Sequence, residues 1–311
     1  MTNNKPQALP VDPLTTERTL EFDASPMLQQ AYPSERAAPE WHCSVSLGFR
    51  TDIGVQRENN EDKFDAFDPE TPSLLAQRGR FWAVADGMGG HAAGQRASEF
   101  GLRYVIKEYF KTKDPNASVA LSKAISYANK QLVTATETHP AYQGMGSTLV
   151  AVTLIDDMAT IANVGDSRVY FLRLGDEPKQ LTVDHSWVEE QIRLGSLTRE
   201  EAEQSKYRNV ITRCLGMDGM PGPDMQTMQV QVGDIFILVS DGITRYFETD
   251  NIAAIVSGKS LSQAAMDLID AANARGGADN STCLLLRIDA ITAWTQIGNR
   301  PLQDRTSDSV K

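Results

Sequence analysis

Residues 81–91 have the sequence Phe-Trp-Ala-Val-Ala-Asp-Gly-Met-Gly-Gly-His. Five mostly apolar residues bounded by turn-forming residues favour a short buried strand over a helix. The strand ends in Asp86, and Gly87, Gly89 and Gly90 permit positive φ and close approach of another group. A carboxylate beside accessible backbone carbonyls suits a hard divalent cation. An ordinary loop with an exposed aspartate has the same local pattern, so the choice between them depends on the rest of the chain.

The composition bounds the class of protein. The 311 residues, 41% of them hydrophobic, are enough for one large domain or two small ones. A net charge of −11 argues against a nucleic-acid partner held on a broad basic surface. Cys43, Cys214 and Cys283 lie far apart without a Cys-x-x-Cys pair, which argues against a disulfide scaffold or zinc ribbon and for a reducing compartment.

Targeting segments are not apparent in the sequence. No apolar run approaches the ~18 residues needed to cross a bilayer. The first residues lack the apolar segment of a secretory signal peptide. We therefore expect a soluble, cytoplasmic protein with no membrane partner. We also expect a monomer.

The chain divides into three parts. Residues 1–40 are rich in Pro, Thr, Ser, Gln and Glu without periodicity, which predicts a disordered N-terminal arm. Residues 41–290 carry the periodic segments of a folded domain, and residues 291–311 are polar and predict a flexible tail. The segment from about residue 185 to residue 216 is charged and poor in large apolar side chains, so we interpret it as a surface flap. A capping box at Thr198 predicts a short helix within it.

Hydrophobic periodicity predicts both strands and helices. Val45, Leu47 and Phe49 alternate with smaller residues, which predicts a half-buried strand. Three closely spaced strand candidates suggest an antiparallel meander. These three candidates cover residues 148–155, 159–164 and 168–174. Further strands are expected near residues 64–67, 235–239 and 283–288. Amphipathic helices are expected near residues 97–105, 121–135 and 261–272.

Five aspartates share a position at the junction of a predicted strand and a turn: Asp62, Asp86, Asp166, Asp241 and Asp279. Carboxylates gathered at a sheet edge repel one another unless cations neutralise them. The four histidines are scattered, which argues against a soft transition-metal site, whereas oxygen ligands favour Mg²⁺ or Mn²⁺. Two such ions close together would suit hydrolysis of a phosphoester.

Six short motifs occur in an order that resembles one known family. They are Arg57-x-x-Asn60-Glu61-Asp62, Asp86-Gly87-Met88-Gly89-Gly90-His91, Gly146-Ser147-Thr148, Gly165-Asp166-Ser167-Arg168, Ser240-Asp241-Gly242 and Asp279-Asn280. Over residues of about 43–290 the chain resembles the metal-dependent serine/threonine protein phosphatases of the type-2C (PPM) family, in their bacterial form. The resemblance implies an α+β fold, an α-β-β-α sandwich of two antiparallel sheets flanked by helices, with the metals at one end.

The resemblance also implies a ligand set for two Mn²⁺ or Mg²⁺ ions. Asp86 would bridge both ions, and the Gly87 carbonyl would bind one of them. Asp241 and Asp279 would hold the other ion.

Further acidic residues would support this centre. Asp62 and Glu61 are expected to act mainly through metal-bound water, and Asn280 is expected to stand behind the ligands. Asp166, together with Asp241, would form the weaker third-metal site of bacterial relatives.

Two residues are assigned by the resemblance to the reaction itself. Arg57 matches the arginine that grips the substrate phosphate, for which its planar fork is suited. His91 would protonate the leaving alkoxide, directly or through water, or else it closes the glycine turn as a structural residue. Arg245 departs from the family pattern, because bacterial relatives often carry an acidic or amide residue four positions after Asp241.

The implied reaction is hydrolysis of phosphoserine and phosphothreonine on proteins, the substrates being those of a Ser/Thr kinase. A hydroxide bridging the two ions would attack phosphorus in line without a covalent intermediate. Two alternatives stay open at this point. One is a catalytically weak or dead relative that binds phosphoproteins, and the other is a small-molecule phosphoesterase with the same site.

Overall fold

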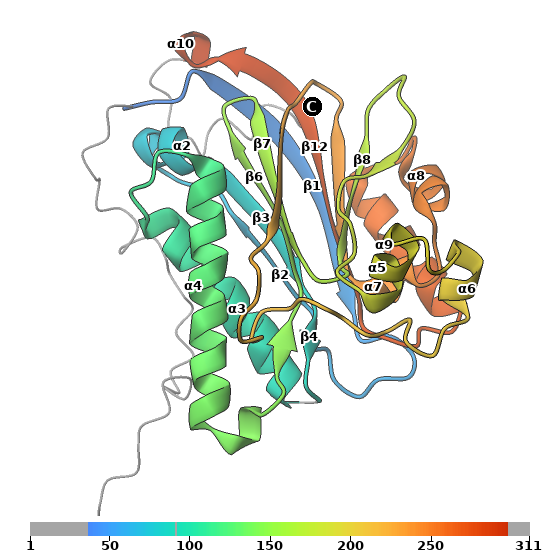
Figure 1. Cartoon of the computed structure of the whole chain (residues 1–311). Coiled ribbons are helices and arrows are strands. Elements are labelled where there is room, and N and C mark those ends of the chain that lie inside the picture. Colours follow the sequence, from blue (N-terminus) through green and yellow to red (C-terminus); the bar gives the residue numbers. More distant parts are fainter. Residues whose placement is uncertain (1–36, 91, 298–311) are drawn as a thin grey trace, which may run out of the picture.

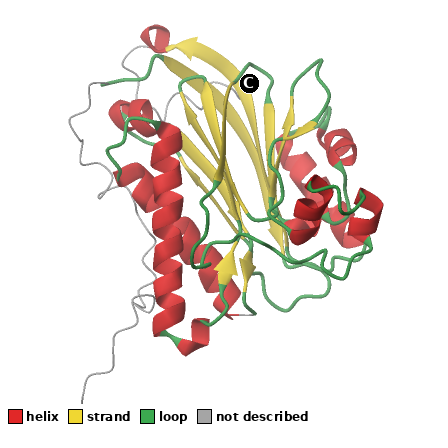
Figure 2. Cartoon of the chain, in the orientation of Figure 1, coloured by secondary structure: helices red, strands yellow, loops and turns green. Residues whose placement is uncertain are grey.

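Two antiparallel β-sheets packed face to face form the centre of the computed structural model, which describes residues 37–90 and 92–297 (Figure 1, Figure 2). Helices cover the outer face of each sheet, so the layers follow the order helix, sheet, sheet, helix. The predicted α-β-β-α sandwich is therefore confirmed. The predicted arm, apart from residues 37–40, and residues 298–311 of the predicted tail lie outside the described residues.

The first sheet joins strands from both ends of the described chain. Its spatial order is β1-β12-β11-β8-β9, and all neighbouring strands are antiparallel. Trp41 of β1 is paired with Ala293 of β12. The bounds are β1 (Trp41–Asp52), β12 (Ser281–Ala293), β11 (Ile235–Val239), β8 (Arg168–Leu172) and β9 (Lys179–Gln180).

The second sheet has the order β10-β7-β6-β3-β2 and is also antiparallel. A small sheet pairs two short strands, of which β4 follows β3 closely in the chain and β5 comes just before β6. The bounds are β10 (Asp224–Gln229), β7 (Met158–Val164), β6 (Leu149–Ile155), β3 (Arg80–Ala85), β2 (Lys63–Phe67), β4 (Gly87–Met88) and β5 (Gly146–Ser147).

Strand β3 is apolar without alternation because both of its faces are covered. Phe81, Ala83 and Ala85 face the helices, whereas Trp82 and Val84 face the other sheet. Every residue of the strand is buried, because both faces of a central strand in a four-layer sandwich are covered. The strand therefore delivers Asp86 from a rigid, fully packed element.

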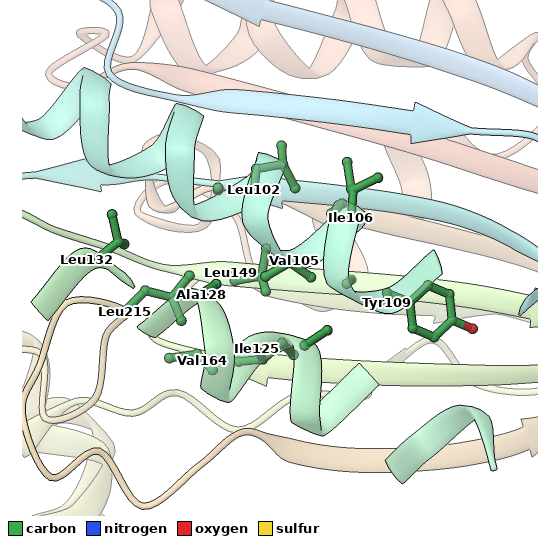
Figure 3. Close-up of a cluster of buried hydrophobic side chains, with 14 of the residues drawn as sticks. Leu102, Val105, Ile106, Tyr109, Ile125, Ala128, Leu132, Leu149, Val164 and Leu215 are labelled. Atoms are coloured by element: carbon green, nitrogen blue, oxygen red, sulfur yellow. The ribbon is translucent and has the colours of Figure 1, made fainter. Parts of the chain in front are cut away.

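The helices form the two outer layers. Helices α3 and α4 pack on the second sheet, and Figure 3 shows Leu102, Val105 and Ile125 from these helices in one cluster with Leu149 and Val164 of the sheet. Helices α8 and α9 pack on the first sheet. In the described ranges no helix is both long and apolar enough to cross a bilayer. The bounds are α2 (Pro72–Arg78), α3 (Ala92–Lys111), α4 (Ala117–Thr138), the 3₁₀ turn η1 (Pro140–Tyr142), α5 (Trp187–Arg193), α6 (Arg199–Glu203), α7 (Asp241–Thr244), α8 (Thr249–Val256), α9 (Leu261–Ala274) and α10 (Trp294–Ile297).

Strand β1 buries different side chains from those that the alternation predicts. Val45 packs against the core between the sheets, but Leu47 and Phe49 are 37% and 57% exposed, and Gly48 is buried against α9. Strands β1 and β2 are edge strands on the same side of the sandwich, so the inner face of β1 opens to solvent there. The Phe49 ring lies 5.0 Å from the ring of Phe64 on β2. Burial at this edge depends on the second sheet, which local sequence does not specify.

The predicted antiparallel meander is wrong for its third strand. Strands β6 and β7 pair with each other, but β8 belongs to the other sheet, where it pairs with β11 and β9. Residues 165–167 carry the chain from one sheet to the other, and short strand spacing cannot distinguish such a crossing from a hairpin. The crossing places Asp166 at the end of the sandwich.

The end of the domain also lies later than predicted. Residues 291–293 continue β12, and Ile291 is paired with Cys43 of β1. Helix α10 follows directly. Main-chain pairing with β1 orders these residues, and Ile291 also packs against the core between the sheets.

Candidate active site

The five aspartates predicted from the sequence come from both sheets and lie at one end of the sandwich. Asp86 directly follows β3, and Asp62 directly precedes β2. Asp241 opens α7 at the end of β11, Asp279 lies just before β12, and Asp166 lies in the crossing between β7 and β8. The charge of Asp86 is repelled by all four of the others, so the fold brings the five carboxylates together.

Burial and mutual repulsion disfavour ionisation of this cluster. Burial is the largest cause, and it raises the pKa of Asp62 to about 7, with Asp241 and Asp279 adding to the rise. Burial followed by the charge of Asp241 raises the pKa of Asp166 to about 8. Burial, then the charges of Asp62 and Asp241, raises the pKa of Asp86 well above its ordinary value. A cation placed among these groups would reverse the shifts.

Two buried carboxylate oxygens have no hydrogen-bond partner within the described part of the chain. They are Oδ1 of Asp62 and Oδ1 of Asp241. The other oxygen of Asp62, Oδ2, accepts a hydrogen bond of 2.6 Å from the hydroxyl of Ser240. Buried polar atoms are nearly always satisfied in folded proteins. The two unsatisfied oxygens, in a donor set made only of oxygen, fit a hard divalent cation such as Mn²⁺ or Mg²⁺.

Two arginines neutralise part of the cluster. Arg57 Nη2 donates to Oδ2 of Asp279 at 2.7 Å. Arg245 Nη2 donates to Oδ2 of Asp241 at 3.1 Å and to Oδ2 of Asp279 at 3.4 Å. Across residues 37–90 and 92–297, no three carboxylate, imidazole or thiol side chains already form a ready ligand set. A cation bound to Asp241 and Asp279 would therefore share these carboxylates with the guanidinium groups or displace them.

The glycine after each strand-ending aspartate is needed for close packing. A Cβ on Gly87 would lie 2.0 Å from a backbone carbonyl oxygen of α3, and one on Gly242 would lie 2.0 Å from that of Asn280. The positive φ predicted for the glycine turn holds for Gly89 and Gly90 but not for Gly87. Gly87 is thus required by contact and not by its backbone conformation.

Thr148 fixes the main chain of Asp86. The Asp86 N–H donates to Thr148 Oγ1 at 2.9 Å, and its carbonyl oxygen accepts from the Thr148 N–H at 2.8 Å. Thr148 Oγ1 also shares a hydrogen bond of 2.7 Å with Ser167 Oγ, next to Asp166. The motif 146–148 therefore links two of the aspartates through one threonine.

Asn280 holds the loop that carries Arg57 and Glu61. Its Oδ1 accepts from the Glu61 N–H at 2.8 Å, and its Nδ2 donates to the carbonyl oxygens of Ile53 and Asn59 at 2.9 and 2.8 Å. Sequence reasoning missed Ser98, whose hydroxyl donates to the Glu61 carbonyl oxygen. A serine on the otherwise apolar face of a helix was the available sign.

His185 connects the predicted flap to the crossing that carries Asp166, and sequence reasoning missed this role. The backbone N–H of His185 donates to the Gly165 carbonyl oxygen at 2.9 Å, and the ring Nδ1 of His185 accepts from the Gly165 N–H at 3.1 Å. Burial lowers the pKa of His185, which keeps the ring neutral and able to accept. The base of the flap is thereby held against the acidic cluster.

A cavity of about 410 Å³ lies beside the cluster, between helices α5 and α6 of the flap and α7. Asp166, Asp241 and Arg245 belong to its wall. A larger cavity of about 530 Å³ runs along β7 and β10 and contains none of the five aspartates. We place the candidate site at the smaller cavity, because chemistry and not volume identifies it. His91 lies outside the described residues, so its assigned role stays a prediction.

Comparison with known proteins gives consistent results. The family model described as protein phosphatase 2C matches residues 52–281. The chain is 37% identical to the serine/threonine phosphatase stp of Listeria innocua over 243 residues, which covers 76% of this chain and 94% of the relative. A Streptococcus agalactiae serine/threonine phosphatase structure aligns with a TM-score of 0.72 and 33% identity, covering 79% of this chain and all of that one. The catalytic domain of the phosphatase PstP, solved in complex with two manganese ions, aligns with a TM-score of 0.68 and 29% identity, covering 79% and 99%.

Proposed function

Because the chain belongs to the protein phosphatase 2C family and is a serine/threonine protein phosphatase of the bacterial type, we propose that its carboxylate cluster is a dinuclear Mn²⁺ or Mg²⁺ centre that removes phosphate from phosphoserine and phosphothreonine. The observation that carries the proposal is the pair of buried, unpartnered oxygens on Asp62 and Asp241. The manganese complex of PstP supports the same view from a similar protein.

The ions would be held by residues of both sheets. Asp86, at the end of the most buried strand, would bridge them, with the Gly87 carbonyl as a further ligand. Asp241 and Asp279 would hold the second ion, and both lie where a guanidinium now neutralises them. When bound, the ions would supply a water that ionises near neutral pH and would stabilise charge on the phosphoryl group.

The remaining acidic residues would complete the centre. Asp62, buried and hydrogen-bonded to Ser240, would act through water on the ions, and Glu61 would stand beside it. Asp166 would contribute to a weaker third site, since it lies in the wall of the cavity with Asp241.

The chain's own groups would bind the substrate and handle the proton. Arg57 is 50% exposed and holds Asp279 with a single nitrogen, so the guanidinium can turn toward a phosphate without unpacking the core. His91 would protonate the leaving alkoxide. No covalent intermediate is expected, because water would be the nucleophile. The three cysteines would be bystanders, since burial raises the pKa of Cys43 and Cys283 to about 12 and that of Cys214 to about 11 and keeps the thiols protonated.

The substrates would be phosphorylated segments of proteins, those of a Ser/Thr kinase, in the cytoplasm, and the enzyme would act as a monomer. The cavity beside the flap gives such a segment a place next to the cluster. All five aspartates are present, and no observation favours a dead relative or a small-molecule phosphoesterase.

Hydrolysis of a phosphothreonine peptide tests this function directly. With Mn²⁺ the full chain should release phosphate, and excess chelator should stop the release. A nucleoside monophosphate at the same concentration should be hydrolysed more slowly. Turnover that survives complete chelation would rule out the metal centre, and faster hydrolysis of the nucleotide would favour a small-molecule phosphoesterase.

A further inference from the structure

Arg245 is a cation at the acidic cluster for which the proposed reaction has no use. It ends the single turn of α7, and its backbone N–H donates to the Asp241 carbonyl oxygen at 2.9 Å. The four-residue spacing places the guanidinium over the Asp241 carboxylate. The same nitrogen, Nη2, reaches Asp279 at 3.4 Å. One side chain thus joins two aspartates that come from different elements.

The two aspartates are those that the proposed function assigns to one ion. Nη2 holds Oδ2 of both, while Oδ1 of Asp241 is buried without a partner. Arg57 differs, because its nitrogen holds only Asp279. A divalent cation held by Asp241 and Asp279 would meet the positive charge of the Arg245 guanidinium, which already contacts both carboxylates. The two cations therefore compete for the same pair of carboxylates.

The guanidinium has somewhere to go when it is displaced. The Arg245 side chain is 34% exposed, and it lines the cavity of about 410 Å³ below the flap. Besides Asp241 and Arg245 themselves, the cavity wall contains five carboxylates but only three guanidinium groups. They are Asp166, Asp184, Glu189, Glu203 and Glu248, and Arg168, Arg199 and Arg208. An arginine that left the cluster would stay in acidic surroundings, so its release is not strongly opposed.

We propose that Arg245 is a built-in counter-ion of the metal centre, which holds Asp241 and Asp279 when no cation is bound and is displaced when one binds. In this arrangement the arginine sets how tightly the centre binds its cation and keeps the metal-free chain from losing stability to repulsion among its carboxylates. The inference rests on the proposed function, because it needs a cation at these aspartates.

Calorimetric titration of the full chain with Mn²⁺ tests the exchange. Arg245→Gln should bind Mn²⁺ about tenfold more tightly, since a competing charge-assisted hydrogen bond is lost. The matched control is Arg103→Gln, which removes another arginine four residues after an acid. Arg103 pairs with Glu99 on α3 at 3.0 Å with similar exposure, and this ion pair includes none of the five aspartates. The control should bind Mn²⁺ as the wild type does.

Thermal melting in chelator supplies a second readout that is independent of activity. Arg245→Gln should melt several degrees below the wild type, Arg245→Lys should lie between them, and Arg103→Gln should melt close to the wild type. The difference between Arg245→Gln and the wild type should shrink when Mn²⁺ is added, because the ion then replaces the missing charge.

The results distinguish this inference from the proposed function. Unchanged Mn²⁺ affinity and unchanged melting of Arg245→Gln, with a wild type that binds Mn²⁺, would overturn the inference alone. Weaker Mn²⁺ binding by Arg245→Gln would also overturn it, because the arginine would then support the ligands instead of competing for them. A wild type that binds no Mn²⁺ would overturn both.

Discussion

The ends of strands β3 and β11 are built alike but are neutralised differently. Each is an apolar strand that ends at an aspartate, and each continues through a glycine packed against a backbone carbonyl. After Asp86 the chain forms the short strand β4, whereas after Asp241 it forms the helical turn α7. Arg245 pairs with Asp241, but within residues 37–90 and 92–297 no lysine or arginine forms an ion pair with Asp86.

The difference shows that the conformation after an aspartate decides which counter-charge it can have. In a helical turn the residue four positions after an aspartate lies beside it. After Asp86 the two residues of β4 are followed by Gly89 and Gly90 with positive φ, and the fourth residue, Gly90, has no side chain that could pair with the carboxylate. Asp86 is therefore left among other carboxylates, and a cation from outside the chain matters most at the β3 end.

Replacing the two aspartates one at a time should give the largest effects. Asp86→Asn should lower hydrolysis of a phosphothreonine peptide by at least about a hundredfold, because an amide cannot bridge two cations and carries no charge. In chelator the same variant should melt higher than the wild type, by about 2–4 °C for each kcal/mol of repulsion removed. Asp241→Asn should also lose activity but should not gain stability, since Arg245 loses its partner.

Activity assays with Mn²⁺ and melting curves in chelator check both variants. Near-native turnover of Asp86→Asn would contradict the assignment of the bridging ligand. An equal gain in melting temperature for both variants would show that Arg245 does not distinguish the two strand ends.

Arg57→Ala should have the next largest effect, and it separates the two arginines by role. Loss of one charge-assisted contact to a phosphate costs about 1.5–3 kcal/mol, so kcat/KM should fall roughly 10- to 150-fold, mainly through KM. Mn²⁺ affinity should change less than in Arg245→Gln, because Arg57 holds only one ligand. Steady-state kinetics and titration measure the two quantities. An unchanged kcat/KM would return Arg57 to the role of an ordinary loop residue.

Asp166→Ala should have a smaller effect on turnover. If Asp166 belongs to a weaker third site, turnover should fall about tenfold, the scale expected for a supporting group. Titration with Mn²⁺ should still find the two tighter sites. Loss of every site, or full activity, would be inconsistent with a third site at this end of the sandwich.

The smallest predicted effect is a dependence of metal-free stability on pH. The pKa of Asp62 is raised to about 7 and that of Asp166 to about 8, both chiefly by burial. The folded state then binds more protons than the unfolded state between about pH 4 and those values, so the free energy of unfolding should fall as the pH rises through this window.

The melting temperature in chelator should accordingly fall by a few degrees between pH 5 and pH 8. Asp62→Asn should flatten the slope, because the amide does not titrate. Saturating Mn²⁺ should flatten it too. A chelated protein that grows more stable over this range would show that other groups dominate.

The sequence was most informative about the fold where both faces of an element are covered. The apolar run of β3 and the stripes of α3, α4 and α9 predict the layers correctly, because burial requires those residue types there. The strand at β1 was predicted correctly, but the side chains that it buries and the crossing at Asp166 were not. Both depend on which sheet a strand joins, and pairing between distant strands leaves no local pattern.

The candidate site was predictable as a set of residues but not as an arrangement. Aspartate followed by glycine at the end of an apolar strand points to Asp86 and Asp241. The hydrogen bonds of Ser98 and His185 could not be predicted, because they join segments far apart in the sequence. The position of Arg245 over Asp279 likewise depends on how α7 meets the start of β12.

The pairing of β1 with β12 has a consequence for biosynthesis. In the described part of the chain β12 is the only strand that pairs with β1, although the ribosome makes β1 first and β12 last. Asp62 lies in the segment between β1 and β2, and Asp279 lies just before β12, so the acidic end needs both extremes of the domain. A ribosome-bound chain that lacks β12 has an incomplete first sheet, and the proposed cation site would be incomplete as well. We therefore expect the proposed centre to assemble only after β12 has been made.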